Sequence, residues 1–207
     1  MELMEQLYIE RYLKQNPNEL SLVQQIKLRD ELRQSDSKKT ASDQYVDFYA
    51  WMKKRPSREE AFAGYLYPKL LPFVNGKILE VGCGPRALLS RRLIESGYNM
   101  TAIDPKLEIT NETFRPEVFS LDYDINQYAC VVALEPCEAA ELIIRLCVQM
   151  GVPFFVVPCG TPHKRMDNRE SENFVDWWTY LKKIDSSIKM SAVNLVPGFM
   201  SVVLTNV

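Results

Sequence analysis

Short apolar runs alternate along residues 77–157 with stretches in which apolar residues recur every three or four positions. The short runs predict β-strands at 77–81, 99–103, 129–134 and 153–157. The periodic stretches predict α-helices at 86–96 and 137–150, each followed by a glycine, a residue that commonly ends a helix. This alternation of strands and helices favours an α/β fold with a mostly parallel sheet.

The pattern before residue 75 differs from this alternation. Apolar side chains recur there at helical spacing, and a helix that carries Phe62, Tyr65, Leu66 and Leu70 on one side is expected. We therefore divide the chain into a helical N-terminal extension or lid at 1–75 and an α/β domain at 76–207.

The C-terminal end predicts one strand of reversed direction. An amphipathic helix near Trp177 is followed by two β-prone runs at 189–196 and 199–207. Only two residues separate these runs, whereas a parallel pair requires a crossover of about a dozen residues or more. The runs must be antiparallel to each other, so we expect a Rossmann-like, mostly parallel sheet with an antiparallel C-terminal strand at or near its edge.

The segment after Asp104 is too short for the usual strand–helix unit. Before the strand expected at 129–134 there is room for a short strand near 117–121, but not for a full helix with its loops. We expect the second crossover helix to be shortened or missing.

Composition and charge exclude several classes of protein. The 207 residues suffice for one domain with an appendage, and 46% hydrophobic with 25% charged residues is ordinary for a globular protein. A net charge of −2 supplies no overall positive field for RNA or DNA. Five cysteines without a CxxC pair are typical of thiols in a cytoplasmic protein. We expect no secretory signal and no membrane partner, because no apolar run approaches the roughly 20 residues that span a bilayer.

A glycine-rich turn stands where the strand at 77–81 passes into the next helix. In Glu80-Val81-Gly82-Cys83-Gly84, the glycines are expected to leave backbone amides open to a ligand, since no side chain covers them. Asp104 ends the next strand and offers two oxygens to vicinal hydroxyl groups. These segments resemble the first two motifs of the class I S-adenosylmethionine-dependent methyltransferases, whose sheet has the same outline.

The resemblance implies which residues hold the cofactor, S-adenosylmethionine. Its methionine end would lie in the turn, along Gly82, Cys83 and Gly84. Glu80 would face the cationic amino group, directly or through water, and Asp104 would hold the ribose hydroxyl groups.

Two further features bear on the cofactor assignment. The family often has an acid near the adenine after the third strand, and Asp122 or Asp124 fits that place. Spacing does not separate the two, and either also fits an ordinary turn; Asp122 is the candidate that we retain. The position after Gly84 departs from the family pattern, because Pro85-Arg86 stands where many members have another small residue.

Dinucleotide binding is the main alternative interpretation of the turn. Gly82, Gly84 and Ala87 also satisfy GxGxxA, with Asp104 at the distance expected for an NAD-binding enzyme. A dinucleotide motif, however, usually opens the first βαβ unit and has an apolar residue where Glu80 stands. The antiparallel ending also favours the methyltransferase interpretation. A third possibility is a turn that only connects a strand to a helix.

Residues for the acceptor chemistry are expected after the strands at 129–134 and 153–157, because ligands of open α/β sheets bind beyond the carboxyl ends of the strands. The sequence ALEPCEAAELI lacks the Asn/Asp-Pro-Pro-Tyr segment typical of one class of amino-group methyltransferases. Glu135 would be a general base if a partly desolvated site raised its pKa. Alternatively, Glu135 only favours a helix N-terminus.

The only histidine, His163, follows the strand at 153–157 in FFVVPCGTPHKRMD. It is either a base or an exposed loop residue. The Val-Pro-Cys ending is similar to a subgroup of class I methyltransferase-like proteins whose fifth strand ends in Pro-Cys-Cys, some of which act on RNA; Gly160 replaces the second cysteine here. No metal is expected, because one histidine and scattered cysteines have no recognised ligand spacing.

We therefore expect a cytoplasmic S-adenosylmethionine-dependent methyltransferase. The acceptor would be an oxygen or nitrogen of a small molecule or RNA, with a small molecule favoured because the chain has no basic excess. A non-catalytic S-adenosylmethionine-binding or regulatory module and an NAD-dependent oxidoreductase are the alternatives. The sequence leaves the acceptor and the oligomeric state open.

Overall fold

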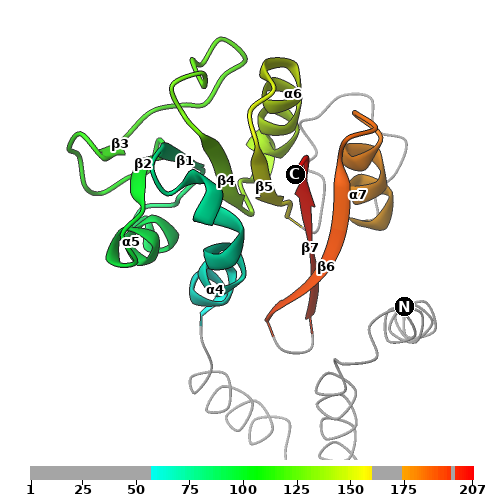
Figure 1. Ribbon diagram of the computed structural model, residues 1–207, viewed down its shortest axis with the longest axis horizontal. Helices are drawn as coiled ribbons and strands as arrows, with labels where there is room; N and C mark the ends of the chain where they lie inside the picture. Colours follow the sequence, from blue (N-terminus) through cyan, green and yellow to red (C-terminus); the bar gives the residue numbers. More distant parts are fainter. Residues whose placement is uncertain (1–56, 160–173, 197–198) are drawn as a thin grey trace, which may run out of the picture. The chain divides into compact units, whose positions relative to one another are not determined.

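The computed structural model describes residues 57–159, 174–196 and 199–207, coloured along the chain in Figure 1. The chain divides into two compact units, Arg58–Val193 with Ser201–Val207 and Met1–Ser57 with Asn194–Met200. In chain order the elements are α4 (Arg58–Leu70), the 3-10 turn η1 (Leu71–Phe73), β1 (Lys77–Val81), α5 (Leu88–Glu95), β2 (Asn99–Ile103), β3 (Phe114–Arg115), β4 (Cys130–Leu134), the 3-10 turn η2 (Cys137–Ala139), α6 (Ala140–Met150), β5 (Phe154–Val157), α7 (Phe174–Lys182), β6 (Lys189–Val196) and β7 (Phe199–Thr205).

Seven strands form one sheet in the order β3-β2-β1-β4-β5-β7-β6. The pairs from β3 to β5 are parallel, and β7 is antiparallel to β5. Because only two residues join β6 to β7, these two strands also run in opposite directions. The expected fold class, a mostly parallel α/β sheet with one reversed C-terminal strand near its edge, is confirmed.

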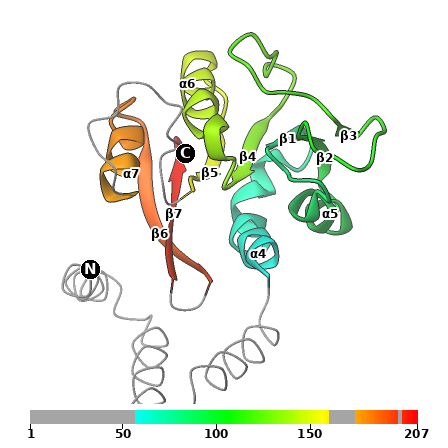
Figure 2. The same ribbon diagram turned by 180° about the vertical axis from the view of Figure 1, so that it is seen from behind.

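The central strands are buried on both faces. Ile78, Leu79 and Val81 of β1 are almost inaccessible to solvent, as are Val131 and Val132 of β4. Helices α4 and α5 lie side by side near β1 and β2, and α6 lies beside β4 and β5 (Figures 1 and 2). The strands β1 and β2 have the bounds that the sequence predicts.

The expected strand at 117–121 is wrong. The third strand is β3, and it ends at Arg115. The Glu117 amide donates to the Arg115 carbonyl at 2.8 Å, so the chain turns away from the sheet at once. Val118 and Leu121, which suggested a strand, are 70% and 58% exposed.

The second crossover helix is missing, as predicted. Residues 104–113 and 116–129 contain no helix. A small buried cluster of Ala87, Ala102 and Phe114 packs at this edge of the sheet, and the Arg91 guanidinium lies over the Phe114 ring, 5.3 Å from its centroid.

Helix α4 buries the predicted face, with Phe62, Leu66 and Leu70 fully covered. Pro68 lies inside this helix, which ends two residues later at Leu70 and is followed by η1. The helical pattern at 1–56 lies outside the described residues, and the domain boundary near residue 75 remains a prediction. In the part of the chain that the structure describes, no helix has the length and apolar character needed to cross a membrane.

Candidate functional site

The glycine turn lies at the point where the sheet changes direction. Strand β1 has β2 on one side and β4 on the other, so the connections after β1 and after β3 lead to opposite sides of it. Ligands of open α/β sheets bind at such a switch point, beyond the carboxyl ends of the strands. Three predicted site residues come directly after the last residue of a strand: Gly82, Asp104 and Glu135. The topology therefore brings them to the same edge of the sheet, at the carboxyl ends of the strands.

The two glycines of the turn have different roles. Gly82 has φ +72°, and a Cβ there would come within 3.0 Å of the Cα and Cβ of Pro136. Gly84 has φ +69°, but a Cβ there would meet nothing within 4 Å. Gly82 is therefore required by close packing between β1 and β4, whereas Gly84 leaves its backbone beside open space where a ligand can approach.

Asp104 contacts the turn directly. Its Oδ2 accepts a hydrogen bond from the Gly84 amide at 2.9 Å, and its Oδ1 accepts one from the Lys106 amide at 2.8 Å. Each carboxylate oxygen has a further lone pair, so the carboxylate can also accept hydrogen bonds from the hydroxyl groups of a ligand.

The expectation that the amides of the turn are open to a ligand is wrong. The Gly82 and Cys83 amides donate to the Ile103 carbonyl at 2.9 and 3.3 Å, and the Gly84 amide donates to Asp104. Sequence patterns do not reveal these bonds, because they depend on how the end of β2 lies against the turn. An anion that needed free amides, such as a pyrophosphate, would find them occupied here.

Glu80 is buried beneath the turn, with 2% of its surface exposed. Its Oε2 accepts hydrogen bonds from the amide of Ser90, at 2.9 Å, and from the Ser90 hydroxyl. Ser90 is the third residue of α5, so Glu80 caps this helix from the neighbouring strand. These bonds give Glu80 a structural role, and a contact with a ligand remains a prediction.

Acidic groups shift the pKa values of two residues at the turn. Burial raises the pKa of Glu80 to about 7, and the Ser90 hydrogen bonds oppose this effect while nearby Glu59 and Asp104 add to it. Burial likewise raises the pKa of the Cys83 thiol, and Glu80 and Asp104 act in the same direction. Cys83 is therefore a protonated thiol rather than a nucleophile.

Glu135 lies on a strained stretch of backbone after β4. Its φ is +52°, that of Cys137 is +49°, and the residue between them, Pro136, packs against Gly82. Such conformations are costly for residues other than glycine and cluster at functional sites. The Glu135 carboxylate forms an ion pair with Nη1 of Arg58, the first residue of α4, and the two side chains are 33% and 47% exposed. The predicted base is therefore held by a cation from another element.

Within the described part of the chain, the hydrogen bonds of Asp122 and Asp124 are to nearby residues and not to the turn. Asp122 lies on an exposed turn and accepts a hydrogen bond from the Ser120 hydroxyl, which lowers the pKa of Asp122. Asp124 accepts hydrogen bonds from the amide and side chain of Asn126. A place near the adenine thus remains a prediction for both acids, and His163 lies outside the described residues.

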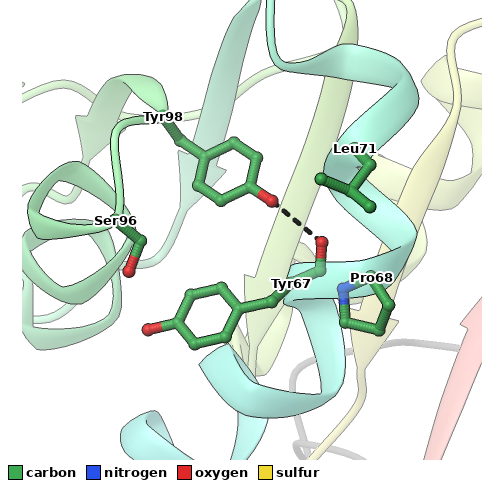
Figure 3. Close-up of a pocket in the computed structure, with 5 residues that line it drawn as sticks. All are labelled: Tyr67, Pro68, Leu71, Ser96 and Tyr98. Atoms are coloured by element: carbon green, nitrogen blue, oxygen red, sulfur yellow. Dashed lines mark hydrogen bonds between the residues drawn. The ribbon is translucent and has the colours of Figure 1, made fainter.

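A cavity of about 410 Å³ lies at the opposite end of α4 (Figure 3). It is lined by Tyr67, Pro68, Leu71, Ser96 and Tyr98, and the Tyr98 hydroxyl donates to the Tyr67 carbonyl at 2.8 Å. Because Tyr98 precedes the first residue of β2, this cavity lies at the amino ends of the strands and is separate from the turn. Within the described ranges, no group of three or more His, Cys, Asp or Glu side chains could hold a metal ion.

Arg58 and Ser90 are site residues that sequence reasoning missed. Arg58 contacts a residue 77 positions away, and Ser90 contacts a strand residue ten positions before it. Neither contact has a local signal, since both depend on tertiary packing.

The order of the strands in the sheet is that of a Rossmann-like fold. Methyltransferases predominate among similar solved structures, whereas no protein-family model and no curated protein matches the sequence.

Three structures illustrate the likeness. DesVI of Streptomyces venezuelae is 9% identical, over 81% of this chain and 98% of that chain, with a TM-score of 0.47. The plantazolicin methyltransferase BpumL in complex with SAH is 13% identical, over 80% and 90%, with a TM-score of 0.44. Geranyl diphosphate methyltransferase in complex with GPP and sinefungin is 13% identical, over 71% and 77%, with a TM-score of 0.47. Such identities concern the fold alone, so the function must be argued from the site.

Proposed function

We propose that this chain is a methyltransferase that binds S-adenosylmethionine at Gly82–Gly84 and Asp104. The observation that carries the proposal is the open space at Gly84, whose amide is 2.9 Å from Asp104. A nucleoside could lie against this bare backbone while the carboxylate accepts hydrogen bonds from its ribose.

The charge of the site supports a sulfonium donor over NAD. The acids Glu59 and Asp104 act on Glu80 at the turn, and they attract a sulfonium and an ammonium and repel a pyrophosphate. The turn amides that would bind phosphate are already occupied. The reversed strand β7 also differs from the all-parallel order of the usual dinucleotide-binding sheet.

The residues of the site would act mainly by positioning. When bound, S-adenosylmethionine supplies a methyl group on a positively charged sulfur. Gly84 and Asp104 would fix its orientation, and alignment with the acceptor can supply several kcal/mol without acid–base help. Glu135 and His163 remain the proposed acceptors of a proton, and Glu135 would act once Arg58 leaves its carboxylate free.

The acceptor that we propose is an oxygen or nitrogen of a small molecule rather than RNA. A net charge of −2 supports this choice. A cytoplasmic location remains part of the same proposal.

A module that binds S-adenosylmethionine without transferring its methyl group is the second candidate. The ion pair between Arg58 and the predicted base Glu135 favours it, as does the missing helix between β2 and β4. Radioactive methyl transfer to pooled metabolites and to total RNA separates the candidates. Background incorporation with a donor that binds would favour the module.

Binding at the turn is tested by thermal stability with S-adenosylmethionine, S-adenosylhomocysteine and NAD. A ligand at one hundred times its Kd adds about 2.7 kcal/mol to the free energy of unfolding. Gly84→Ala should remove the stabilisation by S-adenosylmethionine, because the new methyl group enters the open space. Gly151→Ala is a matched control, because Gly151 also has a positive φ, +66°, and an added Cβ there would meet nothing within 4 Å. Gly151 is the C-cap of α6 and does not belong to the turn. Stabilisation by NAD alone would refute the proposal.

A further inference from the structure

Among the described residues, the guanidinium of Arg58 has more hydrogen-bond donors than partners. A guanidinium carries five N–H donors in a planar fork. Among the described residues, the acceptor that contacts the Arg58 guanidinium is the carboxylate of Glu135, which pairs with Nη1. Nearly half of the Arg58 side chain is exposed, so the remaining donors are accessible to a ligand.

One contact and one electrostatic effect place the start of α4 near the turn. Glu135, the partner of Arg58, precedes Pro136, which packs against Gly82. Glu59, the next residue of α4, lies close enough to Glu80 to raise its pKa. Arg58 therefore lies at the switch point of the sheet, on the side of β4, whereas Asp104 lies on the side of β2.

We propose that Arg58 binds the carboxylate of the methionine end of S-adenosylmethionine, an inference that rests on the proposed function. This ligand carries an anionic carboxylate as well as its cationic groups. Glu59 and Asp104 repel the carboxylate, so the carboxylate requires a positive partner at the turn. The planar guanidinium of arginine matches the geometry of a carboxylate. The ion pair with Glu135 holds the Arg58 guanidinium in place before the ligand binds.

Arg86 is the competing cation, because it follows the turn by two residues. Its described contact is through its backbone carbonyl, which accepts a hydrogen bond from Arg91 Nε at 2.9 Å. No side-chain contact of Arg86 is described that would hold its guanidinium toward Gly84. The geometry therefore favours Arg58, and Arg86→Gln tests this choice.

The experiment compares S-adenosylmethionine with decarboxylated S-adenosylmethionine, which lacks only the carboxylate. Dissociation constants are measured by calorimetry for the full chain and for Arg58→Gln, Arg58→Lys, Arg86→Gln and Glu60→Gln. The last is a matched control, since Glu60 is on the same turn of α4 but pairs with Arg92. The substituted side chains are partly exposed, so the variants are expected to fold; circular dichroism and melting temperature check this.

We expect the unaltered chain to bind S-adenosylmethionine roughly tenfold or more tightly than the decarboxylated form. Arg58→Gln should abolish this preference, Arg58→Lys should keep part of it, and Glu60→Gln should keep all of it. Equal weakening of both ligands by Arg58→Gln, or loss of the preference in Arg86→Gln, would overturn the inference while leaving the proposed function intact. If the unaltered chain binds neither ligand, the proposed function itself fails.

Discussion

The buried carboxyl group of Glu80 should make the stability of the fold depend on pH. Burial raises its pKa from 4.5 to about 7. A carboxyl group whose pKa is higher in the folded state binds more protons there than in the unfolded state. The contribution of Glu80 to the free energy of unfolding should therefore be greatest below pH 4.5. This contribution should decrease as the pH rises to 7.

The size of this effect follows from the two pKa values. At about 1.4 kcal/mol per pH unit, the interval from 4.5 to about 7 corresponds to ~3 kcal/mol. A typical domain has a free energy of unfolding of about 5–15 kcal/mol, so the loss is large enough to measure. Glu80→Gln keeps the size of the side chain and an oxygen for Ser90 but removes the titration.

Urea unfolding of both proteins at several pH values between about 4 and 8 tests the prediction. The difference in stability between Glu80→Gln and the unaltered chain should shift in favour of the variant by ~3 kcal/mol across this interval. A constant cost of the buried amide would shift the whole curve without altering its slope. Glu95→Gln removes the same charge from an exposed position of α5 and should follow the unaltered chain. Parallel curves for Glu80→Gln and the unaltered chain would refute the reasoning.

Three other substitutions or reagents test the site. Gly82→Ala should lower the free energy of unfolding by about 2 kcal/mol or more in urea titrations, because it combines a positive φ with a contact at 3.0 Å; an unchanged midpoint would contradict the packing argument. Asp104→Asn should weaken S-adenosylmethionine roughly tenfold in calorimetry, since a charged acceptor is lost, and unaltered affinity would exclude the ribose role. Iodoacetamide at pH 7 should modify exposed Cys137 before Cys83, whose pKa is raised; peptide mass spectrometry showing the reverse order would contradict the raised pKa of Cys83.

The site was only partly predictable. The turn and Asp104 carry local signals, because a strand end followed by glycines, and an acid at the end of the next strand, can both be recognised along the chain. Their proximity follows from parallel pairing of β1 with β2, which places the two strand ends together. The occupation of the turn amides was not predictable, since it depends on which carbonyl and carboxylate oxygens the folded chain places opposite them.

The sequence by itself determined the strands β1 and β2, the missing crossover helix and the reversed β7. The strands are visible in the local pattern of apolar residues. The missing helix and the reversed strand follow from the number of residues that connect neighbouring strands. Tertiary structure alone decided that Glu80 caps α5 through Ser90 and that Arg58 pairs with Glu135. It also placed the third strand at Phe114–Arg115 rather than at 117–121. Side-chain partners distant along the chain are chosen by sheet order and helix packing, and periodicity contains no information about either.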